Sequence, residues 1–169
     1  MSTVFVVANT RVYSVTYVTD NVLMTLQNIV RLSGLSPSKI SDDWDSIHRA
    51  MKTWIESEHL IRVVLEVYSP ATGKLVGRWD IDIGYGWNSS DGNFWVDTDQ
   101  IKTAILKQGV WPSQCKYDII MENRPGRPDV PGWSSCSFRS TDGLIRQSLG
   151  STVQHSGLAA SASYYRSKN

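Results

Sequence analysis

The side chains that could support metal or nucleophilic chemistry are few and widely spaced. The candidate soft ligands are three histidines and two cysteines, namely His48, His59, His155, Cys115 and Cys136. No Cys-x-x-Cys or His-Glu-x-x-His spacing joins them, so zinc-type ligation is not expected. A cysteine nucleophile would need one cysteine beside His155 and an orienting acid or amide, and no local pattern supports that arrangement. We therefore expect no metal site, no catalytic residues and no cofactor.

Two further groups resemble catalytic or phosphate-binding motifs only in part. Asp80 and Asp82 share one face of an expected strand, as paired carboxylates can, but solvation of that face accounts for both. The run from Gly84 to Trp87 resembles half of a glycine-rich phosphate loop, without the third glycine, the Lys-Ser/Thr pair or the following helix. The sequence therefore carries no enzyme signature.

Composition argues against two classes of electrostatic partner. The chain has 17 basic and 16 acidic residues, and its formal net charge of +1 is too small for a general grip on nucleic acid or an anionic membrane. The best basic and aromatic group, Arg124 and Arg127 with Trp133, lies in a proline-rich stretch that predicts a loop. No apolar run reaches the roughly 18 residues that a membrane helix needs. We expect no membrane contact and no direct nucleic-acid binding.

Compartment and class follow from the same composition. The first residues lack the positive region of a secretory signal, and with only two cysteines the chain is expected in the reducing cytoplasm. Its 41% hydrophobic content supports one sizeable core within 169 residues. Seven Trp, seven Tyr and three Phe are residues favoured in cores and at recognition surfaces.

Hydrophobic periodicity predicts an α+β domain with about three helices and an antiparallel sheet. The helices are expected at 17–32, from a Ser41 cap to 55, and from Asp97 to 109, and the strands at 60–68, 75–83, 94–96, 115–122 and 134–139. Polar or irregular connections are expected at 84–93 and 124–132. The hairpin 60–83 alternates apolar residues with Arg62, Glu66, Arg78, Asp80 and Asp82, which predicts one face in water.

The last thirty residues differ from the rest in composition. Half of residues 140–169 are Ser, Thr, Gly or Ala, and the glycines Gly143, Gly150 and Gly157 leave the backbone free to repack. A strand-like pattern returns in Ala160-Ser-Ala-Ser-Tyr-Tyr-Arg166. The segment is therefore expected to be a mobile strap with an adhesive end.

The order of these elements resembles the HORMA domain, above all its bacterial branch in CBASS antiphage signalling operons. The resemblance rests on Tyr17–Val30 as the opening helix, on Trp133 with Cys136–Thr141, and on Ala160–Arg166. It implies one domain with an N-terminal segment (1–16), a core (17–139) and a C-terminal safety belt (140–169).

The resemblance implies a peptide-binding module rather than an enzyme. The belt would fold over a short peptide from a partner protein, and the peptide would pair with the edge Ser134, Ser135, Cys136, Ser137, Phe138 and Arg139. The belt's closing strand, formed by Ala160, Ser161, Ala162, Ser163, Tyr164, Tyr165 and Arg166, would pair beside residues 115–122, against Tyr117, Ile119 and Met121.

The resemblance also implies two protein partners. The peptide-bound form would activate a cGAS/DncV-like nucleotidyltransferase, and an AAA+ remodelling ATPase would engage the N-terminal segment at Ser2, Thr3, Val4 and Phe5. Residues 2–15 are uncharged except for Arg11, which permits an extended strand that such an ATPase could grip. The alternatives are a constitutively closed HORMA adaptor without sensing, a small aromatic-rich nucleic-acid-binding protein, and an unrecognised hydrolase.

Overall fold

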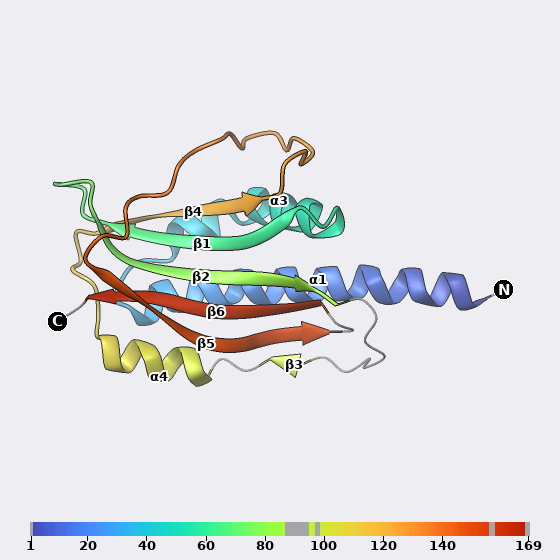
Figure 1. The fold of residues 1–169 in the computed structure, drawn as a ribbon, viewed down its shortest axis with the longest axis horizontal. Coiled ribbons are helices and arrows are strands. Elements are labelled where there is room, and N and C mark those ends of the chain that lie inside the picture. Colours follow the sequence, from blue (N-terminus) through green and yellow to red (C-terminus); the bar gives the residue numbers. More distant parts are fainter. Residues whose placement is uncertain (1, 87–94, 97–98, 156–157, 168–169) are drawn as a thin grey trace.

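The computed structural model describes residues 2–86, 95–96, 99–155 and 158–167. Four helices are assigned in these ranges, α1 (Ser2–Leu32), α2 (Ser38–Asp42), α3 (Trp44–Glu56) and α4 (Asp99–Gln108). Six strands are assigned, β1 (Leu60–Tyr68), β2 (Leu75–Tyr85), β3 (Trp95–Val96), β4 (Lys116–Asn123), β5 (Leu144–His155) and β6 (Leu158–Ser167). The strands form one antiparallel sheet in the order β3-β5-β6-β2-β1-β4, with α1 lying across one face (Figure 1). This is the expected α+β arrangement.

Helix α1 is the main cover of the sheet. Its buried stripe contains Val18, Val22, Leu26 and Ile29, which recur at helical spacing as the sequence predicts. The helix begins at Ser2, so the expected extended N-terminal segment is wrong. A β-branched residue lowers helix propensity by less than about 1 kcal/mol, and a helix already formed at 17–32 gains a hydrogen bond with each added residue. In Figure 1 the first turns of α1 project beyond the sheet.

The second expected helix is divided in two. Pro37 precedes the short α2, which contains Ser41, so Ser41 does not cap a longer helix. Asp43 stands at the N-cap of α3 and makes no side-chain capping hydrogen bond. The predicted apolar stripe of α3 is confirmed, with its middle members Ile47 and Met51 buried. The short strand at 95–96 is also confirmed, while 87–94 and the expected helix start at Asp97 lie outside the described residues.

The central hairpin β1–β2 is antiparallel as expected, but its second face does not face water. Leu65 lies opposite Trp79 and contributes to the core on the helix side. On the other face Glu66 and Asp80 are both 0% exposed, so the predicted wet face is wrong here. The cause is a long irregular segment, residues 124–143, which we call the arm. It leaves β4, returns along the sheet and enters β5 at the opposite end (Figure 1).

The strand expected at 134–139 is not formed. These residues are irregular within the arm, and the Arg139 amide donates to the Glu66 carboxylate instead of to a strand backbone. Their main chain therefore lies over the outer face of the sheet, where it cannot continue a ladder.

The C-terminal segment forms strands β5 and β6, which we call the C-terminal hairpin. Strand β6 contains the expected strand 160–166, but it pairs with β2 and not beside 115–122, where the sequence analysis placed it. On β2 its alanines fill narrow inner positions and Tyr164 stacks on Trp79, which explains this choice of edge. Gly150 has φ +102 beside a register shift in β5, a conformation that favours glycine, and Gly157 lies outside the described residues.

Candidate functional site

Five charged side chains meet on the outer face of the sheet, opposite the helices. They come from β1, β2, β4 and the arm and are Glu66, Arg78, Asp80, Asp118 and Arg139. In the strand register, Glu66 lies between Arg78 on one neighbour and Asp118 on the other. Arg78 is only 6% exposed. Buried charges require partners, so the arm that covers them is held by electrostatics as well as packing.

The inner part of this cluster is a two-point ion pair on β2. Arg78 Nε and Nη2 donate to the two Asp80 carboxylate oxygens at 2.7 and 3.1 Å. Burial alone would lower the pKa of Arg78, but the hydrogen bond and charge of Asp80 outweigh it and raise the pKa. The guanidinium lies 4.5 Å from the ring centre of Phe138 in the arm and 5.0 Å from that of Tyr165 in β6. Arg78 thus links β2 to both segments that cover it.

Arg139 fastens the arm to β1. Its Nη1 and its backbone amide donate to the two oxygens of Glu66 at 2.7 and 2.8 Å. Its guanidinium carbon also lies 3.7 Å from the ring centre of Tyr68. Since Glu66 has no solvent exposure, this contact provides charge compensation that water cannot replace.

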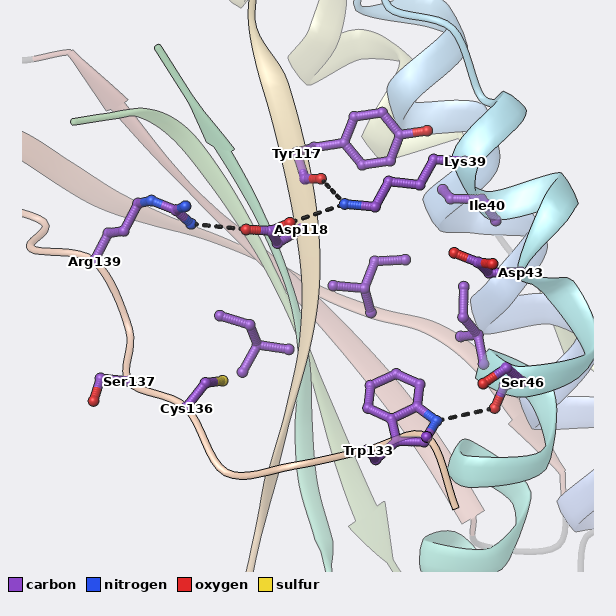
Figure 2. Close-up of a pocket in the computed structure, with 14 residues that line it drawn as sticks. Lys39, Ile40, Asp43, Ser46, Tyr117, Asp118, Trp133, Cys136, Ser137 and Arg139 are labelled. Carbon is purple, nitrogen blue, oxygen red and sulfur yellow. Dashed lines mark hydrogen bonds and ion pairs between the residues drawn. The ribbon is translucent and has the colours of Figure 1, made fainter. Parts of the chain in front are cut away.

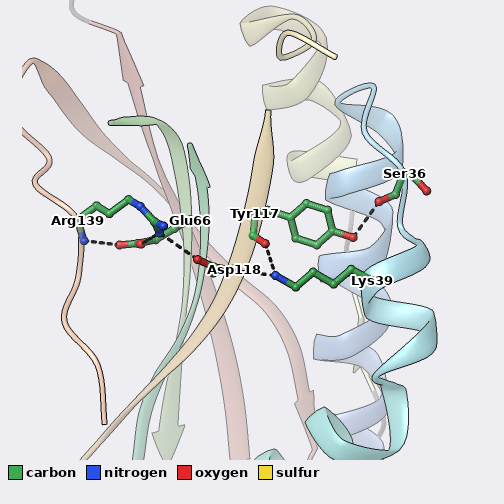
Figure 3. A network of polar contacts seen from close by, with 6 residues as sticks. All are labelled: Ser36, Lys39, Glu66, Tyr117, Asp118 and Arg139. Carbon is green, nitrogen blue, oxygen red and sulfur yellow. Dashed lines mark hydrogen bonds and ion pairs between the residues drawn. The ribbon is translucent and has the colours of Figure 1, made fainter. Parts of the chain in front are cut away.

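Asp118 extends the network around the edge of β4 to helix α2. It accepts from Arg139 Nη1 at 3.2 Å and from Lys39 Nζ at 2.9 Å (Figure 3). Partial burial alone would raise the pKa of Asp118, but Lys39 and Arg139 outweigh burial and hold it below its usual value. Lys39 also donates to the Tyr117 backbone carbonyl at 2.7 Å. One lysine therefore binds both a side chain and a main-chain acceptor at the sheet edge.

The outer edge of β4 is open to strand addition in the described ranges. Because Tyr117 turns its carbonyl away from β1 toward Lys39, alternate residues Ile119 and Met121 present their amides and carbonyls to the same side. No strand among residues 2–86, 95–96, 99–155 and 158–167 pairs there, since β4 ends the sheet. The Tyr117 and Met121 carbonyls of this row accept side-chain hydrogen bonds from Lys39 and Asn123. An edge without a strand partner is the usual site of β-augmentation.

A groove runs beside this edge, between α2–α3 and the arm. It consists of two adjoining cavities of about 660 and 540 Å³, both lined by Ile119, Ile120, Trp133 and Cys136. Figure 2 shows Lys39 and Ser46 on the helix side and Arg139 on the arm side. The Trp133 indole N–H donates to the Ser46 carbonyl at 3.3 Å, which holds this ring against α3 where the two cavities adjoin. We call this feature the β4 groove.

The opposite side of the three-strand core is covered by the C-terminal hairpin. The Tyr164 ring stacks on Trp79 with centres 4.8 Å apart and planes at 24°. Between this pair and Leu158, the inward residues of β6 are Ala160 and Ala162, both buried. A strand with so little apolar volume at these two positions gains less from packing there than β1 or β2 does.

The structure gathers the two sequence-predicted edges into one place. Arm residues 134–139 and the β4 residues Tyr117, Ile119 and Met121 all line the β4 groove. The belt residues 160–166 lie across the sheet on β2, and Gly143 ends the arm. The N-terminal residues 2–5 belong to the projecting first turns of α1, away from the groove.

Sequence reasoning missed the buried charges and Lys39. The alternation of the sequence indicates that Asp80 and Glu66 face solvent, whereas the structure buries both. A partial signal was present, because Glu66 and Arg78 carry opposite charges and are register partners on neighbouring strands. No local pattern marks Lys39, which lies 79 residues before its partner Asp118.

The described residues hold no group of three or more His, Cys, Asp and Glu side chains that could bind a metal ion. Cys115 is buried and Cys136 exposed, and neither forms a disulfide. Burial raises the pKa of the Cys115 thiol, which opposes nucleophilic reactivity. Among the described helices, none is long and apolar enough to cross a membrane.

Comparison with known proteins gives the family. The fold is similar to that of a chain in the crystal structure of the mitotic checkpoint complex, with a TM-score of 0.63 and 13% sequence identity over 78% of this chain and 74% of that chain. It is also similar to C. elegans HTP-2 bound to the HIM-3 closure motif, with a TM-score of 0.51 and 11% identity over 72% of this chain and 68% of that chain. No curated protein matches the sequence. The profile of the family described as Bacterial HORMA domain 2 matches residues 1–168. The chain therefore belongs to the bacterial HORMA domain family.

Proposed function

We propose that this HORMA domain captures a short extended peptide by strand addition and that its C-terminal hairpin moves to admit the guest. HORMA relatives bind closure motifs, as C. elegans HTP-2 does with the HIM-3 motif. The observation that carries the proposal is the asymmetry of the sheet. One edge of the β2-β1-β4 core pairs with β6, whose middle inward residues are small, and the other edge has no strand partner among the described residues and lies beside a groove.

The proposed exchange has two steps. Strand β6 leaves β2, whose backbone then accepts the guest, and β6 takes the open edge of β4. The arm residues 134–139, first expected to pair with the peptide, serve in this proposal as a wall of the β4 groove.

Strand direction supports this exchange. Strands β2 and β4 are both antiparallel to β1, so they run in the same direction. Strand β6 is antiparallel to β2, and it can therefore pair antiparallel with β4 without reversing its own direction. The backbone hydrogen bonds lost on one edge can therefore be regained on the other. Ion pairs from Lys39 and Arg139 to Asp118 oppose entry to the groove and would keep the resting arrangement populated.

The energy required is within reach of a peptide strand. Moving a two-state population from 1:99 to 99:1 takes about 5.5 kcal/mol of differential binding. A guest that buries two or three larger side chains gains about 1.5–3 kcal/mol for each of them. A belt wrapped around such a guest would have to unfold locally before release, so the complex should dissociate slowly.

The partner role follows from the family resemblance. In this proposal the peptide-bound form binds and activates a cGAS/DncV-like nucleotidyltransferase in CBASS antiphage defence, and an AAA+ ATPase resets it through residues 2–5. The projecting N-terminal turns of α1 support such a reset, because α1 also lies against β5 and β6. Pulling on this helix would uncover the surface on which the C-terminal hairpin rests. The domain itself would act as an adaptor and not as an enzyme.

A capture experiment tests the proposal. The purified full chain is mixed with a library of random-sequence decapeptides, and the rate at which retained peptides dissociate is measured at 50 and 500 mM salt. We expect retained peptides with slow and nearly salt-independent dissociation, and two monomeric forms on ion exchange. A constitutively closed adaptor would give one form. Single-stranded nucleic acid bound with a steep loss of affinity in salt, and no retained peptide, would support the nucleic-acid alternative instead.

A further inference from the structure

Strand β6 contacts β2 through a regular pattern of side-chain sizes. On the helix side, Tyr164 stacks on Trp79, which has no solvent exposure. Of the preceding inward residues, Ala162 lies opposite Ile81, and Ala160 lies opposite Ile83. Helix α1 contacts this face of β6, so a larger residue in place of either buried alanine would overlap core atoms. The inner side of the seam therefore accepts small, small and aromatic residues in turn.

The outer side of the same seam has its own requirement. Tyr165 lies opposite Arg78, with its ring centre 5.0 Å from the guanidinium carbon. Ser163 lies opposite the buried Asp80 and is itself only 2% exposed, so this position also takes a small side chain. The two adjacent tyrosines therefore contact β2 on opposite faces of the sheet: Tyr164 stacks on the Trp79 indole, and Tyr165 lies against the Arg78 guanidinium.

We infer that a peptide taking the place of β6 on β2 carries two adjacent aromatic residues preceded by small residues, in the pattern small-x-small-small-aromatic-aromatic. This inference rests on the proposed function, since it names the ligand of that site. Trp79 and Arg78 belong to β2, inside the three-strand core, and they stay in place when β6 leaves. A guest on β2 meets the same indole, the same guanidinium and the same narrow positions over Ile81.

The chain's own strand supplies the probe. A labelled synthetic peptide with the sequence of residues 158–167 is titrated into the full chain and into the full chain carrying Tyr164→Ala and Tyr165→Ala. The tethered strand competes at a high effective concentration, so binding to the wild-type chain should be weak. Loss of one aromatic stack and one cation–π contact from the tethered strand should make the variant bind the peptide about tenfold more tightly.

Substituted peptides test the pattern itself. A peptide in which both tyrosines are alanine should bind the variant chain about tenfold more weakly than the native peptide. A peptide with leucine in place of the alanine at the Ala162 position should also bind more weakly, because that position is narrow. Equal affinity for all three peptides would overturn the inference.

Two further measurements cover a failure of the variant to fold. In the wild-type chain, millimolar native peptide should speed amide hydrogen exchange in β6, and the alanine peptide should not. In an Arg78→Lys chain, which keeps the charge beside Asp80, the advantage of a tyrosine at the Tyr165 position should shrink. If random peptides without the pattern are captured while the 158–167 peptide is not, the ligand inference fails and the proposed function stands. If no peptide of any sequence is captured, both fail.

Discussion

Replacing Arg139 with alanine should destabilise the fold and release the arm. Glu66 has no solvent exposure, and the change removes the guanidinium 2.7 Å from its Oε1. Breaking a buried pair by deleting one partner costs about 3–5 kcal/mol. The alanine at 139 would keep the amide that donates to Oε2 at 2.8 Å, so part of the compensation remains. We expect a loss of about 2 kcal/mol in the free energy of unfolding.

Urea unfolding followed by circular dichroism measures this loss. For a chain of this size a 2 kcal/mol loss lowers the unfolding midpoint by about 1 M. Arg49→Ala is the matched control, because Arg49 is exposed on α3 and has no ion pair within the described part of the chain. That control should change stability by less than about 0.5 kcal/mol.

A double-mutant cycle separates the charge effect from loss of packing. Glu66→Gln removes the buried charge, so Arg139→Ala should cost much less in that background than in the wild-type chain. The reasoning would be refuted if Arg139→Ala cost no more than the Arg49 control, or if the two substitutions at 66 and 139 were simply additive.

Three other perturbations follow from the same contacts. The folded state holds the pKa of Asp118 below its unfolded value of 3.8, so the stabilisation from this carboxylate is present above pH 3.8 and is lost as the pH falls through the folded pKa. The substitution Asp118→Asn should therefore reduce the fall in the urea unfolding midpoint as the pH is lowered into this acid range. An unchanged dependence of the midpoint on pH would contradict the assignment. Gly77→Ala should cost about 1–3 kcal/mol in thermal or urea unfolding, because its Cβ would lie 2.6 Å from Trp111 Nε1. In the same strand Gly84→Ala meets nothing closer than 4.0 Å and is the control; equal losses would reject the packing argument. Lys39→Met should change the free energy of unfolding by under about 1 kcal/mol, since Lys39 is exposed. The same substitution should increase the fraction of protein that elutes as the second monomeric form on ion exchange. An unchanged fraction would show that Lys39 does not oppose strand pairing at the β4 edge.

Local periodicity was enough to predict the core elements. Alternation in 60–68 and 75–83 gave the central hairpin, and helical spacing gave the buried stripes of α1 and α3. These signals are local, because each residue's face follows from its position in its own element. The start of α1 could not be read in the same way, since valines at 4, 6, 7 and 12 are compatible with both helix and strand.

The site depended on contacts that no local pattern encodes. Glu66 and Asp80 alternate like solvent-facing residues, and only the arm, more than forty residues later, makes them buried. The strand with which β6 pairs could not be predicted from the sequence either, because the run of Ala and Ser at 159–163 is compatible with more than one edge of the sheet. What decided it was the match between Tyr164 and Trp79, which appears only once both strands are in register.

A reversible lock between β2 and β6 tests the central claim most directly. Asp82 and Ser161 are register partners, so Asp82→Cys with Ser161→Cys should form a disulfide across the seam, in a Cys136→Ser background that removes the exposed native thiol. The reduced protein is the matched control for the oxidised one. The account predicts that the oxidised chain retains no peptide from the random decapeptide library and that reduction restores capture. Equal capture by the oxidised and reduced forms would contradict it, because a guest would then bind without β6 leaving β2.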